Sequence, residues 1–132
     1  MRLAALLLCG ALALAACGGG GGTPKRSEAD RVRDTLTAFA QASAKHDYRR
    51  VCADLLAKPV IDAVRGAGLS CESAMKTALQ GVQSPKLEVR QVTIKGNRAS
   101  AKVHTTAANQ QASDDTVALV REGGAWKIGA LS

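Results

Sequence analysis

Apolar residues in the first half of the chain recur every three or four positions. These residues are Val32, Leu36, Phe39 and Ala40. Such a period places them on one face of an α-helix, which we expect to run from Glu28 to about Lys45. Ser27 and Asp30 have the spacing of a capping box in which an aspartate replaces the usual glutamate. The sequence therefore predicts an amphipathic helix with a defined start.

Three shorter helices are predicted between this helix and residue 80. Asp47 is a plausible N-cap for the first of them, whose inner face consists of Val51, Cys52 and Leu55. The next begins near Pro59, a residue that suits the first helical turn, and ends at the glycines 66 and 68. Ser70 caps the last, which carries Cys71, Met75, Ala78 and Leu79.

The second half of the chain alternates apolar and polar residues with a period of two, which is typical of strands. Residues 87–94 alternate with one slip at Arg90 and Gln91, which predicts a bulge. Gly96 and Asn97 suit a tight turn, and residues 99–105 alternate again. We therefore expect a β-hairpin in this part of the chain.

A polar stretch from Ala108 to Asp115 follows, which we interpret as a loop. Thr116–Glu122 is then a third strand, and Gly123–Gly124 turns the chain into a fourth. In this fourth strand, one face is expected to carry Trp126, Ile128 and Ala130. Helices followed by an antiparallel sheet define an α+β fold, with the helices packed on a curved sheet of about four strands.

The N-terminal segment has a different composition. After Arg2, residues 3–16 are all Leu, Ala, Gly or Cys, a run shorter than the roughly 20 residues that span a bilayer. Residues 1–16 are typical of a secretory signal peptide. The run ends in Leu14-Ala15-Ala16-Cys17, which resembles the lipobox of bacterial lipoproteins. An ordinary signal peptide with an incidental cysteine is the alternative.

The lipobox resemblance implies cleavage before Cys17 and acylation of its thiol. The partner would be the lipid bilayer, and the location the extracytoplasmic face of a bacterial membrane. Residues 17–26 include five consecutive glycines and are expected to form a flexible tether. These glycines lack the strand, helix and lysine of a phosphate-binding loop, and we expect no cofactor. The folded domain then covers residues 27–132.

Two cysteines, Cys52 and Cys71, remain in the predicted domain. In an exported protein such a pair usually forms a disulfide, which here would close a loop of about 20 residues and stabilise the fold by about 3 kcal/mol. Two free buried thiols are the alternative. Zinc is disfavoured, because a structural site needs four ligands and only His46 and His104 could complete one.

Several features together resemble the NTF2-like superfamily, whose members fold into a cone of helices and a curved sheet. They are the long first helix, the Asp47-Tyr48 pair, the short helices and the last hairpin, residues 120–128, with its Gly-Gly-x-Trp-Lys-Ile motif. The resemblance covers residues 27–132. It implies that Trp126 packs between sheet and helices, and Trp126 is also the largest apolar group available to close the core.

Enzymes of this superfamily, isomerases and dehydratases, use an aspartate base with tyrosine or histidine partners inside the cone. That pattern does not carry over here. Asp47 has a capping role, His46 lies at a helix boundary, and His104 alternates with the inward Val103. We therefore expect a non-catalytic, membrane-anchored module without a metal site that binds a small apolar ligand or an envelope protein. The alternatives are an isomerase-type or dehydratase-type enzyme and a structural envelope lipoprotein.

The chain is basic, with 18 Lys and Arg against 11 Asp and Glu. The basic residues are spread along the sequence from Lys25 to Lys127, and Phe39, Tyr48 and Trp126 are the only aromatic residues. Three aromatic side chains cannot form a stacking platform for bases, so nucleic acid is an improbable partner. A positive domain can still associate with an anionic envelope.

Overall fold

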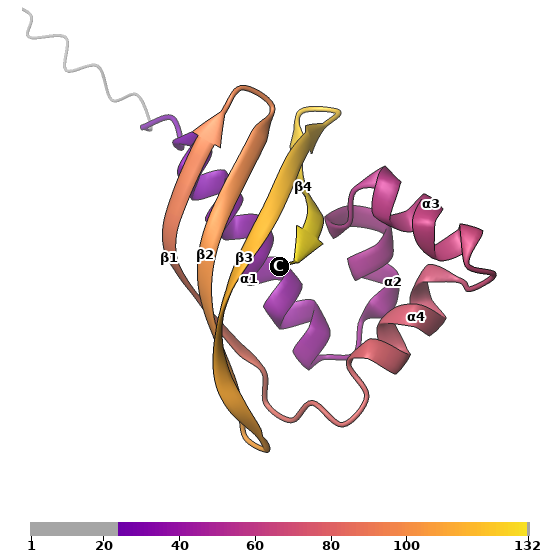
Figure 1. Cartoon of the computed structure of the whole chain (residues 1–132). Coiled ribbons are helices and arrows are strands. Elements are labelled where there is room, and N and C mark those ends of the chain that lie inside the picture. Colours follow the sequence, from indigo (N-terminus) through magenta and orange to yellow (C-terminus); the bar gives the residue numbers. More distant parts are fainter. Residues whose placement is uncertain (1–23, 132) are drawn as a thin grey trace, which may run out of the picture.

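The computed structural model of this chain describes residues 24–131. The predicted signal peptide, residues 1–16, and the predicted lipidation site, Cys17, lie outside the described residues. Within the described part, no helix is long and apolar enough to cross a membrane. The described chain forms one α+β domain in which helices cover one face of an antiparallel sheet, as the sequence predicts (Figure 1).

The helices come first in the chain. The long helix α1 (Glu28–Ala44) is capped by Ser27, whose hydroxyl accepts a hydrogen bond from the Asp30 amide at 3.1 Å. Next come α2 (Tyr48–Arg50), a π-helical turn η1 (Val51–Leu55), α3 (Lys58–Gly66) and α4 (Cys71–Ala78). The predicted second helix is thus split, because the Leu56 amide bonds to the Val51 carbonyl five residues back.

The four strands form a single sheet in sequence order, β1-β2-β3-β4. Their bounds are β1 (Lys86–Lys95), β2 (Arg98–Ala107), β3 (Gln110–Glu122) and β4 (Ala125–Leu131). The predicted irregularity in β1 is present, since the register shifts between Val89 and Gln91. The parallel bridge between Leu56 and Ile128 attaches the segment after η1 to β4.

The predicted loop from Ala108 to Asp115 is wrong. The strand β3 begins at Gln110, and only a tight turn separates it from β2. The polar residues pair across the two strands, as in the hydrogen bond of 2.8 Å between the hydroxyls of Thr105 and Ser113. Polar composition indicated a loop, but this end of the hairpin has few apolar neighbours to pack against and can remain polar as a strand.

The prediction for the last strand is correct for two of its three residues. Trp126 and Ile128 are buried, but Ala130 is exposed. The register shifts by one residue in β4, because Leu119 pairs with Ile128 and the neighbouring Ala118 with Ala130. Gly129 is the extra residue, and this bulge moves Ala130 off the buried face.

The core lies between α1, η1 and the inner face of the sheet. Val32, Leu36, Val51 and Val117 are fully or almost fully buried. The other residues of the same buried apolar cluster are Ala42, Leu55, Leu56, Ala99, Ala101, Val103, Leu119, Trp126 and Ile128. In contrast, α3 and α4 contain no buried residue. Most of the hydrophobic stabilisation therefore comes from α1, η1 and the sheet.

Candidate functional site

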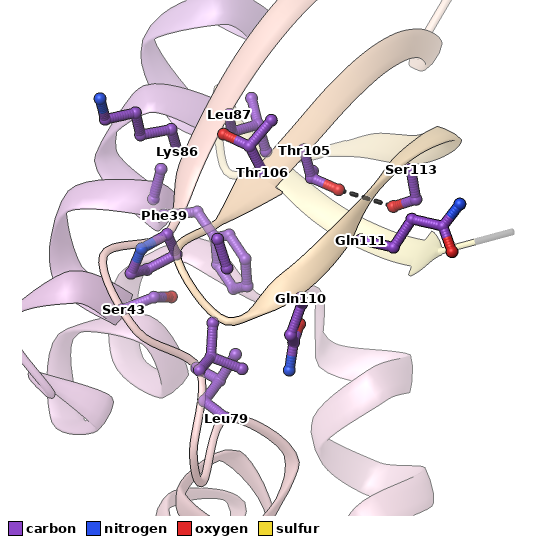
Figure 2. A pocket seen from close by; sticks show the side chains of 14 residues that line it. Phe39, Ser43, Leu79, Lys86, Leu87, Thr105, Thr106, Gln110, Gln111 and Ser113 are labelled. Carbon is purple, nitrogen blue, oxygen red and sulfur yellow. Dashed lines mark hydrogen bonds between the residues drawn. The ribbon is translucent and has the colours of Figure 1, made fainter.

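A cavity of about 210 Å³ lies between the C-terminal half of α1, the loop after α4 and the β2–β3 end of the sheet. Figure 2 shows the side chains that surround it. In Figure 1 this region is at the lower end of the sheet, where the β2–β3 turn lies. The cavity is therefore at the end of the domain opposite to the described N-terminus.

One wall of the cavity is apolar. It consists of Phe39 from α1, Leu79 and Val82 from the loop after α4, and Pro85 and Leu87 where β1 begins. Each of these residues is only partly buried. Partly buried apolar residues that surround an open volume are typical of a binding pocket for a small molecule.

The facing wall is polar and comes from the hairpin of β2 and β3. It presents the hydroxyls of Thr105 and Ser113 and the amides of Gln110 and Gln111. These groups can both donate and accept hydrogen bonds. Lys86 is the only ionisable side chain among the described residues that line the cavity. The cavity thus combines an apolar surface with uncharged hydrogen-bonding groups.

Ser43 lies on the α1 side of the cavity and is 5% exposed. Its hydroxyl has no hydrogen-bond partner among the described residues. Leaving a buried hydroxyl without a partner costs about 1–3 kcal/mol. A buried polar atom that lowers stability in this way is often part of a functional site.

A carboxylate lies behind the polar wall. Asp115 accepts a hydrogen bond from the Ser113 hydroxyl at 2.7 Å and a long one from Thr105 at 3.5 Å. Asp115 is opposite Val103 in the register, so it is on the inner face of the sheet. The sequence analysis missed this acid because it assigned Asp115 to a loop. Residues 113–116 are all polar, so no alternation in the sequence could have revealed it.

The residues that the sequence analysis weighed as catalytic are outside the cavity. The Asp47 carboxylate caps α2, accepting a hydrogen bond from the Arg50 amide at 3.1 Å. His46 stands edge-on to Tyr48, with the ring centroids 5.9 Å apart. On the outer face of the sheet, His104 Nδ1 is 2.8 Å from Asp114 Oδ1. The structure brings none of these groups together with the cavity.

Cys52 and Cys71 are joined by a disulfide, the pairing that the sequence predicts. Their Cα atoms are 6.0 Å apart, and the bridge links η1 to the first residue of α4. The described residues contain no group of three or more His, Cys, Asp or Glu side chains that could hold a metal ion.

A second polar cluster lies at the other end of the domain. The Glu28 carboxylate accepts a hydrogen bond from the Trp126 indole nitrogen at 2.9 Å and forms an ion pair with Arg121. The hydrogen bond from Trp126 lowers the pKa of Glu28 below its ordinary value of 4.5, and the charges of Arg121 and Arg31 act in the same direction. No pattern in the sequence pointed to Glu28, whose partners Arg121 and Trp126 are more than 90 residues away.

Known structures share this architecture. A Campylobacter jejuni protein described as an NTF2-like transpeptidase matches with a TM-score of 0.51, covering 75% of this chain and 97% of that one at 14% identity. An NTF2-like protein of unknown function from Silicibacter pomeroyi matches with a TM-score of 0.54, covering 77% of this chain and 90% of that one at 13% identity.

A second NTF2-like protein of unknown function, from Shewanella baltica, has a TM-score of 0.53 over 82% of this chain and 98% of that one, at 12% identity. No protein-family model and no curated protein matches the sequence. At these identities the likeness concerns the fold alone. The domain has an NTF2-like fold, as the resemblance in the sequence implied.

Proposed function

We propose that this chain is a lipid-anchored protein on the extracytoplasmic face of a bacterial membrane, and that its domain binds a small, partly apolar ligand without transforming it. The observation that carries the binding proposal is the cavity of about 210 Å³ with one apolar and one polar wall. Sites for drug-sized ligands measure roughly 300–1,000 Å³. The ligand is therefore small, or part of it extends out of the cavity.

We base the proposal that the domain does not catalyse a reaction on the residues around the cavity. A base for proton abstraction must reach the substrate with its carboxylate or imidazole. Among the described lining residues the only ionisable group is Lys86. Hydroxyls and amides orient a ligand by hydrogen bonds, and they need an adjacent base to act as nucleophiles.

The anchor is proposed from the sequence before the domain. Cys17 follows Leu14, Ala15 and Ala16, as in a lipobox, and six residues separate it from Pro24, where the described chain begins. Mass spectrometry of the protein purified from membranes should find a chain that begins at Cys17 and carries acyl groups. Cys17→Ser should leave the precursor uncleaved and without acyl groups. A wild-type chain without any acyl mass would contradict the anchor.

The cavity can be tested with an environment-sensitive apolar dye, 1-anilinonaphthalene-8-sulfonate. Leu79→Arg places a charge in the apolar wall, and we expect it to weaken dye binding by about tenfold or more, because one buried leucine contact is worth about 1.5–3 kcal/mol. Leu69→Arg is the matched control, since Leu69 is 52% exposed and does not line the cavity. Equal dye binding by both variants would contradict the proposal.

A second candidate function is proton transfer at the polar wall, and Asp115 is the observation that favours it. Its carboxylate is on the inner face and bonded to Ser113, which lines the cavity. We rank it second, because Asp115 does not line the cavity itself. Substrates with an acidic C–H group can separate the two functions. Turnover that disappears in Asp115→Asn while dye binding persists would establish the enzyme.

A further inference from the structure

The described chain begins at the end of the domain where two hairpin turns meet. The Arg121 amide, at the end of β3, donates a hydrogen bond of 2.8 Å to the carbonyl of Asn97 in the β1–β2 turn. Arg121 also pairs with Glu28 in the first turn of α1. Figure 1 shows the start of α1 beside the ends of these hairpins. We call this region, residues 24–34, 95–98 and 121–124, the anchor end.

The anchor end carries a net positive charge. Its three segments contain seven Lys and Arg against four Asp and Glu, a net charge of +3. Each of the four acidic residues has a partner. Asp34 pairs with Arg26, and Asp30 pairs with Arg33. Glu28 pairs with both Arg31 and Arg121, and the Glu122 carboxylate accepts a hydrogen bond from the Lys58 amide.

Three cations of the anchor end remain without such a partner. Lys25, Lys95 and Arg98 have no carboxylate of the described residues within 4.0 Å, and all three are exposed. Lys95 and Arg98 face each other across the β1–β2 turn. Exposed cations without counter-charges in the protein are available to an external anionic surface.

The segments around the cavity, at the opposite end of the domain, carry a small net negative charge. We call residues 43–47, 80–88 and 104–115 the mouth end, because most of the cavity lining comes from them. Hydrogen bonds join its parts, such as that from the Ala108 amide to the Gln83 carbonyl at 2.8 Å. With both histidines neutral, it contains two Lys against four Asp and Glu, a net charge of −2. The remaining described residues contain eight Lys and Arg against three Asp and Glu, a net charge of +5, so net negative charge is confined to the segments around the cavity.

We propose that the anchor end rests on the anionic headgroups of the bilayer through Lys25, Lys95 and Arg98, and that the cavity faces away from the membrane. This orientation rests on the proposed lipid anchor. A glycine-rich segment of the length of residues 17–26 spans roughly 17 Å on average. The anchor end is thus held near the headgroups, where each Lys or Arg strengthens association roughly fivefold.

The orientation defines how the ligand arrives. Phe39 is 12 residues after Ser27 along α1, a distance of about 18 Å in a helix that rises 1.5 Å per residue. The cavity therefore receives its ligand from the aqueous side and not from within the bilayer.

The single tryptophan of the chain is a reporter for this orientation, because the indole of Trp126 contacts Glu28 at the anchor end. Energy transfer from Trp126 to a dansyl group on lipid headgroups rises as the anchor end approaches the membrane. The experiment uses the full acylated protein in phosphatidylglycerol vesicles and in phosphatidylcholine vesicles. Flotation of the vesicles measures anchoring separately.

Two charge reversals are compared. Lys95→Glu with Arg98→Glu changes the anchor end, and Lys76→Glu with Lys102→Glu makes the same change in charge at exposed residues outside both ends. Thermal unfolding of each variant checks that the domain still folds. With anionic vesicles we expect the anchor-end variant to dock about 25-fold more weakly or worse, so that transfer falls to the level of neutral vesicles. The control should retain the wild-type level.

The outcomes separate the two proposals. Wild-type protein that fails to float with vesicles would overturn the anchor, and the orientation with it. Normal flotation with equal transfer in wild type, anchor-end variant and control would overturn the orientation and leave the anchor intact. An equal loss of transfer in both variants would also overturn it, because net charge alone would then explain the association.

Discussion

The Glu28 carboxylate connects the first turn of α1 to the last hairpin. It accepts the Trp126 indole N–H and pairs with Arg121, whose guanidinium lies over the same indole, 4.9 Å from the ring centroid. Thr35 adds a hydrogen bond to the Trp126 carbonyl at 3.2 Å. The largest side chain of the core is therefore held by packing, by its polar edge and by its backbone.

Trp126→Ala should lower the free energy of unfolding by about 3–5 kcal/mol, because it removes a large buried side chain and leaves a cavity. Trp126 is 3% exposed. Urea denaturation followed by circular dichroism measures the loss. Trp126→Phe, the control, keeps much of the packing and loses the indole N–H, so its loss should be smaller. An alanine variant as stable as wild type would mean that Trp126 does not close the core.

Glu28→Gln should remove a pH-dependent part of the stability. The Trp126 hydrogen bond, with Arg121 and Arg31, keeps the pKa of Glu28 below 4.5 in the folded state. A lowered pKa stabilises the fold above the unfolded value, and this contribution is lost as pH falls through the folded pKa. Wild type and Glu28→Gln should therefore differ most above pH 4.5 and converge in more acidic solution.

Urea denaturation at a series of pH values measures this difference. Glu72→Gln makes the same chemical change on the exposed surface of α4. It corrects for the effect of removing one negative charge from a basic protein. A difference between wild type and Glu28→Gln that stays constant across the acidic range would contradict the linkage.

At the residue scale, the sequence predicted which apolar side chains are buried. It missed polar contacts between residues that are far apart in the chain. Trp126 was expected in the core and is buried. Glu28 was expected only as the start of a helix, since its partners Arg121 and Trp126 are 93 and 98 residues away. No local rule relates a helix start to a hairpin so distant in the chain. No local rule predicts either that the buried Ser43 hydroxyl at the cavity has no hydrogen-bond partner among the described residues.

At the scale of elements, the error over residues 108–115 had the largest functional consequence. The long helix, the bulge in β1 and the turn at Gly96 were predictable from capping residues, periodicity and turn residues, whereas the π-helical turn η1 was not. The start of β3 was not, because its polar residues resemble a loop in composition. Its pairing with β2 builds the polar wall of the cavity. Because this one segment was assigned to a loop, the sequence analysis missed the polar wall of the candidate site.

The disulfide is the covalent link between η1 and α4, and removing it should cost about 3 kcal/mol for a loop of about 20 residues. Cys52 and Cys71 are 19 residues apart in the sequence. The variant Cys52→Ser with Cys71→Ser can be compared with wild type by urea denaturation without reductant. Adding reductant should bring wild type close to the variant and leave the variant unchanged. Equal stability without reductant would show that the bridge does not contribute.

At the scale of the whole molecule, stability and binding surface are distributed unevenly. Apart from Ala57, just before α3, the fully buried residues belong to α1, η1 and the sheet, whereas α3 and α4 have none. The loop after α4 supplies Leu79 and Val82 to the cavity. The cavity therefore has one rigid side, formed by α1 and the sheet, and one side that depends on weakly packed helices and the disulfide. Such a division lets a site adapt to a ligand while the core stays intact.

Amide hydrogen exchange should reveal this division. Exchange in α1, β2 and β3 should require nearly global unfolding, because their amides are bonded within the best-buried part of the molecule. Amides of α3 and α4 should exchange at least about tenfold faster, through local opening that leaves the sheet intact. Mass spectrometry of peptides from residues 28–44 and 58–78 compares the two regions after correction for intrinsic rates.

Reduction of the Cys52–Cys71 bridge should accelerate exchange in α4 and leave α1 unchanged. Uniform protection across both regions would mean that the helices open only with the whole domain, so the cavity would have no independently mobile side.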